Sequence, residues 1–224
     1  MSLWRQSLEI ARIDLVVERR IGDTFRIILP FAVIALMIFS LAFGFDITSS
    51  GDAGPGVFWA IAILFGMQIA LRSSALETES RRDLTTLLGL DPAARFLGRS
   101  ISAAILLAGF TLVLFVAMLL LYSPELPGAW AGPLALALIL TTIGLALLST
   151  LAGEVTSGLR NRTALASLIV APLVIPLVVG ASQVLEAMER SSGILLWVLL
   201  LTTTDLVLLV AGVGLSRPLE EAAR

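Results

Sequence analysis

Six long stretches without a charged side chain, broken only by Asp205 in the last of them, make up most of this 224-residue chain. An ionised side chain is costly in hydrocarbon, and an apolar helix needs about 20 residues to cross a bilayer. Uninterrupted apolar runs, rather than ten-residue alternation, favour helices over a barrel. We therefore expect an all-α integral membrane protein with one transmembrane domain over residues 1–224, and transmembrane helices at 27–45, 53–71, 100–123, 130–153, 163–185 and 193–215.

The distribution of arginine predicts the orientation of these helices. Short loops rich in basic residues stay in the cytoplasm, and all 15 basic residues of the chain are arginine. Fourteen of them lie before the first run, after the second, after the fourth or after the sixth. Arg190 alone lies in the opposite loops, among acidic residues. Both termini are therefore expected in the cytoplasm.

The composition excludes several classes of function. The chain is 58% hydrophobic with a net charge of −2, which leaves no basic face suited to nucleic acid. It has no Cys and no His, so thiolate chemistry and the commonest general base and metal ligand are missing. The phosphate-binding loop of ATPases ends in Gly-Lys-Ser/Thr, and because the chain has no Lys it does not contain this loop. We expect no catalysis, no bound metal and no cofactor in this chain, and an energy source in another subunit or a gradient.

Residues 1–26 precede the first run and have a helical pattern. Five aliphatic residues share one face, and charged residues lie opposite: Leu3, Ile10, Ile13, Val17 and Ile21 against Arg5, Glu9, Arg12 and Arg20. This pattern predicts a helix that lies flat at the membrane interface. A second apolar patch of Trp4, Leu8, Ala11 and Leu15 could face the bundle. A cleaved signal peptide is the alternative, but its apolar core would begin earlier than Ile27.

Residues 72–99 form the longest hydrophilic segment and predict a rigid elbow. The second helix is expected to continue to Leu88, with a C-terminal cap at Gly89. Asp91 then suits an N-cap, with Pro92 as the first helical residue. Such an elbow, held between two membrane helices, is suited to receive the push of a partner, although a solvated connector would have a similar composition. The candidate docking residues are Glu77, Glu79, Arg81, Arg82, Asp83, Leu84, Leu87, Leu88 and Asp91.

Two features within the predicted spans have both a structural and a functional interpretation. Pro172 and Pro176 each remove a helical hydrogen bond, so we expect a bend near Val174 that is either a static kink or a moving hinge. Asp205 follows three threonines near the middle of the sixth span. An acid in this position is a candidate proton carrier or pathway residue, or it accepts hydrogen bonds from neighbouring hydroxyls.

Several motifs resemble the haem exporter protein B family (CcmB), over nearly the whole chain and in matching order. The most specific pair is the segment from Thr156 through Gly158 and Leu159 to Arg160, followed by Ala171-Pro-Leu-Val-Ile-Pro-Leu-Val-Val-Gly180. Pro55, Gly56 and Trp59 are similar to the motif that opens the second helix in that family. Leu84-Thr-Thr-Leu-Leu88 before Asp91-Pro92 is similar to the family's motif in the elbow.

The resemblance implies an ABC-2 type permease fold in the bacterial inner membrane. It implies a role in cytochrome c maturation, either in haem export or in the ATP-driven release of a haem-loaded periplasmic chaperone. The partners it implies are an ABC ATPase (CcmA-like) that uses ATP and docks on the elbow, two membrane proteins (CcmC-like and CcmD-like) and a chaperone (CcmE-like). The pathway would be completed either by a second copy of the chain, in a homodimer, or by another membrane subunit. The alternatives are an ABC-2 exporter permease for another substrate and a non-transporting scaffold for an ATPase.

Haem as cargo raises the question of iron ligands. Haem iron is held by His, Cys, Met or Tyr, and only the last two occur in this chain. The candidates are Met37, Met67, Met118, Tyr122 and Met188. We therefore favour an energy-transducing role over passage of haem through this subunit.

Overall fold

The computed structural model describes residues 3–22, 24–49, 53–75, 90–122, 130–156, 162–190 and 192–222. Across these ranges every regular element is helical. The elements are α1 (Leu3–Ile21), the short π-helix η1 (Thr24–Ile28), α2 (Leu29–Ser49), α3 (Ala53–Ala75), α5 (Pro92–Tyr122), α6 (Ala131–Val155), α7 (Arg162–Glu189) and α8 (Leu195–Ala222). The prediction of an all-α protein is confirmed for this part of the chain.

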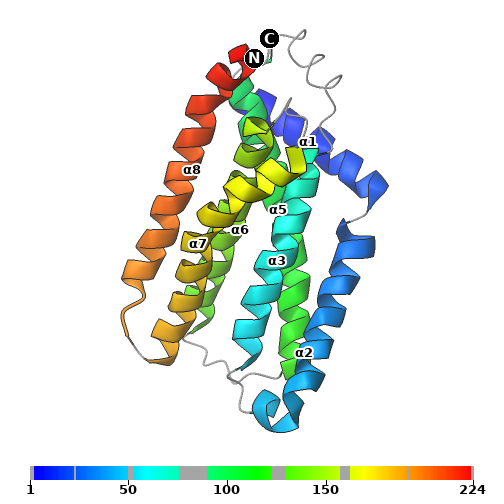
Figure 1. Cartoon of the computed structure of the whole chain (residues 1–224), viewed down its shortest axis with the longest axis vertical. Helices are drawn as coiled ribbons and strands as arrows, with labels where there is room; N and C mark the ends of the chain where they lie inside the picture. The colour runs from blue at the N-terminus through cyan, green and yellow to red at the C-terminus, as the bar shows by residue number, and fades with distance from the viewer. Residues whose placement is uncertain are drawn as a thin grey trace.

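The six helices from α2 to α8 run alternately down and up in one bundle, so both termini lie at the same end (Figure 1). Helix α1 crosses that end instead of joining the bundle. Helix α5 packs against α1, α2, α3, α6 and α8, and α6 packs against α3, α5, α7 and α8. These two helices form the centre of the arrangement, and α1 is joined to the bundle mainly through α5.

Five helical stretches of the described residues are long and apolar enough to cross a membrane. They are Thr24–Ala42, Pro92–Tyr122, Ala131–Val155, Val170–Met188 and Leu195–Pro218. The predicted span at 53–71 falls in α3, where the described apolar stretch is the shorter Gly56–Ile69. The chain is a multi-pass membrane protein, and the sixth span stays a prediction.

The turn between α1 and α2 is fixed by Gly22 and Glu18. Gly22 has φ +71°, a left-handed conformation that suits glycine after a helix end, and its N–H donates to the Glu18 carbonyl at 2.6 Å. The buried Glu18 carboxylate accepts hydrogen bonds from the backbone N–H of Thr24, at 3.2 Å, and from its hydroxyl. Pro30 has no N–H for the carbonyl one turn earlier, and the wider turns of η1 lie directly before it.

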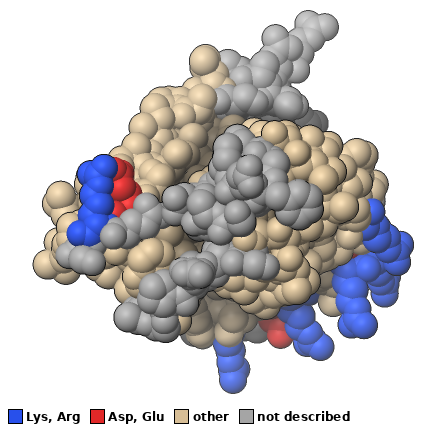
Figure 2. Space-filling model, turned by 90° about the horizontal axis from the view of Figure 1, so that it is seen from below, with Lys and Arg blue, Asp and Glu red and all other residues tan. Residues whose placement is uncertain are grey.

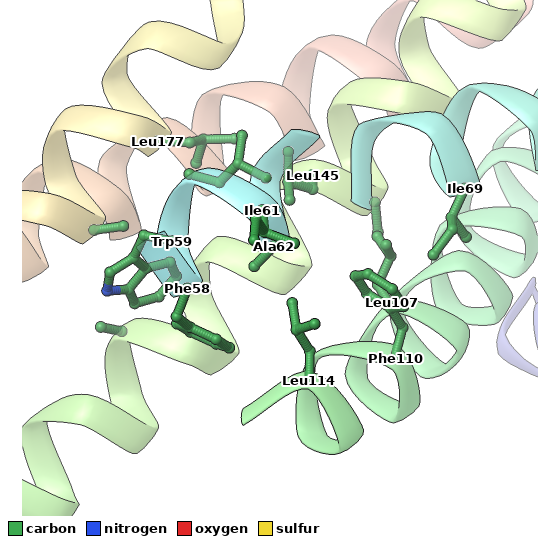
Figure 3. Packing of buried hydrophobic residues seen from close by; sticks show 14 of the residues in the cluster. Phe58, Trp59, Ile61, Ala62, Ile69, Leu107, Phe110, Leu114, Leu145 and Leu177 are labelled. Atoms are coloured by element: carbon green, nitrogen blue, oxygen red, sulfur yellow. The ribbon is translucent and has the colours of Figure 1, made fainter. Parts of the chain in front are cut away.

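The core is formed by aliphatic and aromatic side chains between α3, α5, α6 and α7. Phe58, Trp59 and Ile61 of α3 face Leu114 of α5 and Leu177 of α7 in this core (Figure 3). The rings of Phe58 and Trp59 meet edge to face with centroids 5.4 Å apart. Without a hydrophobic driving force in lipid, such close packing is what holds membrane helices together.

The outer surface is apolar along the helices. Leu41, Leu120 and Leu195 are each at least 70% exposed. Seen from the end opposite the termini, the described surface is largely uncharged, and basic side chains extend past the outline of the bundle at its edge (Figure 2). A water-soluble protein rarely exposes so much apolar surface, so this surface suits contact with lipid.

Candidate functional site

Of the nine candidate docking residues in the predicted elbow, one can be placed. Asp91 is described, and the other eight candidate docking residues lie outside the described residues: Glu77, Glu79, Arg81, Arg82, Asp83, Leu84, Leu87 and Leu88. The predicted helix start is confirmed, because α5 begins at Pro92 and the Asp91 carboxylate accepts the Ala93 N–H at 3.0 Å. The structure adds a set of contacts from α1, α6 and α8 that surround the first two turns of α5.

Asp91 connects α5 with both ends of the chain. Its second carboxylate oxygen accepts a hydrogen bond and ion pair from Arg217 Nη2 of α8 at 3.2 Å. Its backbone N–H donates to the side-chain oxygen of Gln6 in α1 at 3.4 Å. This residue of the predicted elbow therefore contacts helices from the first and last parts of the sequence.

One turn further along, α5 is paired with α6 through buried charges. Arg95 Nε lies 3.7 Å from Glu154 Oε1, and these side chains are 4% and 2% exposed. Buried charges are tolerated when they are paired, and each of these residues has a further interaction within the chain. Arg99 is also buried, one turn along the same face of α5.

Two glycines allow very close helix crossings at the same place. A Cβ atom added at Gly98 of α5 would lie 2.6 Å from the backbone oxygen of Ser7 and 2.8 Å from the side chain of Ile10, both in α1. A Cβ atom added at Gly212 of α8 would overlap the ring of Phe96 in α5. Small residues at such crossings let membrane helices approach. We call the set Gln6, Ser7, Ile10, Asp91, Arg95, Phe96, Gly98, Glu154, Gly212 and Arg217 the α5 joint.

The twin prolines lie within an unbroken α7. Pro172 and Pro176 both fall inside the helix Arg162–Glu189. Helix α7 changes direction along its length, since its yellow first part leans across the bundle and its later part runs along it (Figure 1). Proline is the usual cause of such a change. The structure holds one arrangement, so a moving hinge stays a prediction.

Asp205 lies in the contact between α8 and α6. Its side chain is 8% exposed, and a Cβ atom added at Gly144 of α6 would lie 2.5 Å from its Oδ1. Within the described residues neither carboxylate oxygen has a hydrogen-bond partner. The hydroxyls of Thr202 and Thr204 donate to backbone carbonyls of their own helix instead, each at 2.8 Å. The alternative in which these two threonines bind the carboxylate is therefore not seen.

Three of the family-motif residues are buried between helices or at a helix end. Trp59 is 4% exposed in the core, and Gly180 of α7 meets the side chain of Leu201 in α8 so closely that a Cβ atom would overlap it. Thr156 is fully buried at the end of α6, where its hydroxyl donates to the Ala152 carbonyl at 2.7 Å. Gly56 is exposed, the side chain of Pro55 is not described, and Gly158, Leu159 and Arg160 lie outside the described residues.

The candidate iron ligands of α5 are occupied by the fold. Tyr122 is 2% exposed and its hydroxyl donates to the Leu36 carbonyl of α2 at 3.2 Å. Met118, one turn earlier, is 1% exposed. Neither group is open to a haem in this arrangement.

Sequence reasoning missed most of the α5 joint. Gln6, Arg95, Glu154 and Arg217 were not among the candidates, although Glu154 is the only charge between residues 126 and 159 and could have been noticed. A lone acid at the end of an apolar run demands a partner. The sequence offers no sign of which arginine that partner would be.

Comparison with known proteins agrees with the resemblance. A family model described as CcmB protein matches residues 5–216. A protein of Pseudomonas aeruginosa named Heme exporter protein B is 29% identical over 208 residues, which cover 90% of this chain and 91% of that protein. Its namesake in Haemophilus influenzae is 31% identical over 185 residues, covering 80% of this chain and 81% of that protein.

Proposed function

The chain belongs to the CcmB protein family, and from this membership we propose that it is the membrane permease subunit of an ABC transporter that serves cytochrome c maturation. Two relatives that match along most of their length are both named Heme exporter protein B. The apolar helices supply a membrane-embedded body for such a subunit. The α5 joint is the observation that carries the mechanism, because it begins at Asp91, within the segment that we expect to receive the ATPase.

In the proposed mechanism, ATP is hydrolysed by a separate CcmA-like subunit and this chain passes on the motion. The partner contacts the elbow at residues 72–99, and its movement enters α5 at Asp91. Since α1, α6 and α8 all contact the first turns of α5, displacement of those turns would move the three helices with them. Helix α2 contacts α5 farther along, through Tyr122 and Leu36, and so lies outside the joint.

The outcome that we favour is release of a haem-loaded chaperone rather than passage of haem through these helices. The phenol of Tyr122 is hydrogen bonded within the fold, and Met118, one turn earlier, is buried. Membrane-embedded partners of the CcmC-like and CcmD-like type and a CcmE-like chaperone outside would then respond to the motion. A homodimer of this chain, or a pair with another membrane subunit, would complete the assembly in the bacterial inner membrane.

Charge reversal in the elbow tests the proposal. The chain is co-expressed with its CcmA-like ATPase, and one variant carries Arg81→Glu with Arg82→Glu while another carries Glu77→Arg with Glu79→Arg. We expect both variants to insert normally and to lose co-purification of the ATPase. The matched control reverses Glu186 and Arg190, which pair with each other at 2.6 Å at the opposite end of the molecule, and should retain the ATPase.

Two results separate this proposal from its alternatives. A chaperone–haem adduct that accumulates in the elbow variants supports the link to cytochrome c maturation, whereas normal adduct turnover without bound ATPase contradicts it. Unaltered ATPase binding in both elbow variants contradicts the docking assignment. Stoichiometric haem in the purified subunit would overturn the energy-transducing role.

A further inference from the structure

The outward side of α1 carries a straight line of arginines. Arg5, Arg12 and Arg19 are spaced by seven residues, which places them along one side of the helix about 10 Å apart. All three side chains are exposed. The opposite side of α1, with Ser7 and Ala11, is buried against the bundle. We call these three arginines the α1 arginine stripe.

Aliphatic side chains lie beside the arginines of the stripe. Leu8 and Val16 flank the stripe and are 45% and 46% exposed, and Ile13, 53% exposed, lies at the edge toward the apolar face of the helix. A solvated helix face or a surface for nucleic acid would not place aliphatic residues beside its charges. A helix that lies at the boundary between lipid headgroups and acyl chains has this mixture, because it meets both.

The apolar surface next to the stripe continues toward the spanning helices. Ile21, Phe25, Ile27 and Phe31, which lead from the end of α1 into α2, are all between 38% and 60% exposed. Seen along the bundle, basic side chains extend past its outline at one edge (Figure 2). A helix at the membrane surface meets lipid headgroups at such an edge.

The stripe is not neutralised by the part of the chain that the structure describes. Among those residues no ion pair is formed by Arg5, Arg12 or Arg19. Of the acids in α1, Glu18 is buried and bound to Thr24, and Asp14 is half-buried with an interaction of its own. Glu9 is the one exposed acid of the helix, so the outward face has an excess of positive charge.

We propose that the α1 arginine stripe is a binding surface for the phosphate groups of anionic lipids, with the side chains of Leu8, Ile13 and Val16 inserted between the headgroups. Guanidinium groups bind phosphate with paired hydrogen bonds. Basic residues near a membrane surface are attracted to anionic lipid, and the attraction is screened within a Debye length. Bound lipid would hold α1 at a fixed depth in the membrane. Because α1 crosses α5 closely at Gly98, the start of α5 would be held at that depth as well.

The full-length protein in vesicles tests this proposal. The vesicles contain phosphatidylcholine with a minor fraction of phosphatidylglycerol, and spin-labelled forms of the two lipids report which one is immobilised at the protein. The test variant is Arg5→Gln/Arg12→Gln/Arg19→Gln. Two controls accompany it: the corresponding triple Lys variant, which keeps the charge, and Arg190→Gln, which removes an arginine at the opposite end.

We expect the wild type to prefer phosphatidylglycerol and to lose this preference in high salt. In the triple Gln variant, the preference for phosphatidylglycerol should fall by up to about fivefold for each arginine removed. The triple Lys variant should keep at least half of the wild-type preference, and Arg190→Gln should keep all of it. An unchanged preference in the triple Gln variant would overturn the proposal. If the triple Gln variant loses ATPase binding while its lipid preference is unchanged, the lipid proposal is also overturned, and the stripe is assigned to a protein partner.

Discussion

At the scale of single residues, the buried Arg95–Glu154 pair should matter more for stability than an exposed pair of the same kind. Removing one member of a buried pair leaves the other charge uncompensated, which costs about 3–5 kcal/mol. The Glu186–Arg190 pair is much more exposed, and such pairs contribute about 0–1 kcal/mol. Glu154→Gln should therefore lower the unfolding midpoint in detergent clearly, and Glu186→Gln should leave it nearly unchanged. Equal midpoints would mean that the pair is solvated in the membrane.

Asp205 is the residue whose role the fold leaves open, because its carboxylate has no hydrogen-bond partner among the described residues. Asp205→Asn keeps the size of the side chain and removes its ability to exchange a proton. If Asp205 carries a proton, we expect normal assembly and a fall of about a hundredfold or more in ATP-dependent chaperone release, comparable to the loss of a general acid or base. The neighbouring Thr202→Val variant, on the exposed side of α8, should keep its activity. Full activity of Asp205→Asn with normal assembly would remove the proton-carrier role.

At the scale of helices, the crossing of α1 over α5 depends on Gly98. A methyl group at this position meets backbone of α1, so relief requires the two helices to separate, and overpacking of this kind costs about 1–3 kcal/mol. Gly98→Ala should lower the unfolding midpoint and make α1 easier to cleave by protease. Gly214→Ala in α8 is the matched control, because a methyl group there meets no neighbour and alanine favours a helix. Equal protease resistance in both variants would argue against a tight crossing.

The helices could be predicted from the sequence more readily than their contacts. The length of the apolar runs predicted the helices of the bundle. The Asp91-Pro92 pair predicted the start of α5, because capping depends on residues that are close together in the chain. The apolar patch of α1 that was expected to face the bundle contributes Ala11, whereas Trp4 and Leu8 are exposed. Helical periodicity cannot tell a face that meets protein from one that meets lipid, since both are apolar.

The α5 joint could not be predicted, because it depends on pairings between distant parts of the chain. Gln6, Glu154 and Arg217 reach α5 from three different helices, and no spacing rule connects them. Glycines at helix crossings cannot be recognised from the sequence either. Gly98 and Gly214 both lie within helices, and only the assembled structure shows that Gly98 is crowded and Gly214 is not.

At the scale of the whole molecule, the ion pair between Asp91 and Arg217 links the elbow to the last helix. Arg217→Glu breaks this link without removing the Asp91 cap of α5, and an exposed pair contributes little to stability. We expect the ATPase to remain bound while chaperone release per ATP hydrolysed falls, by the equivalent of about 0.5–2 kcal/mol of coupling. Arg217→Lys keeps the charge and should behave like the wild type. Full coupling in Arg217→Glu would show that the motion leaves α5 by another helix.

The orientation of the bundle in the membrane can be tested with unusual clarity, because the chain has no cysteine of its own. Arg190 lies at the end opposite the termini, and Arg12 lies in α1 at the terminal end; both are exposed. In intact cells, a membrane-impermeant maleimide should label Arg190→Cys and not Arg12→Cys, because arginine-rich segments are retained on the cytoplasmic side. A permeant maleimide should label both and shows that each cysteine is accessible. Labelling of Arg12→Cys by the impermeant reagent would invert the topology and move the elbow away from any cytoplasmic ATPase.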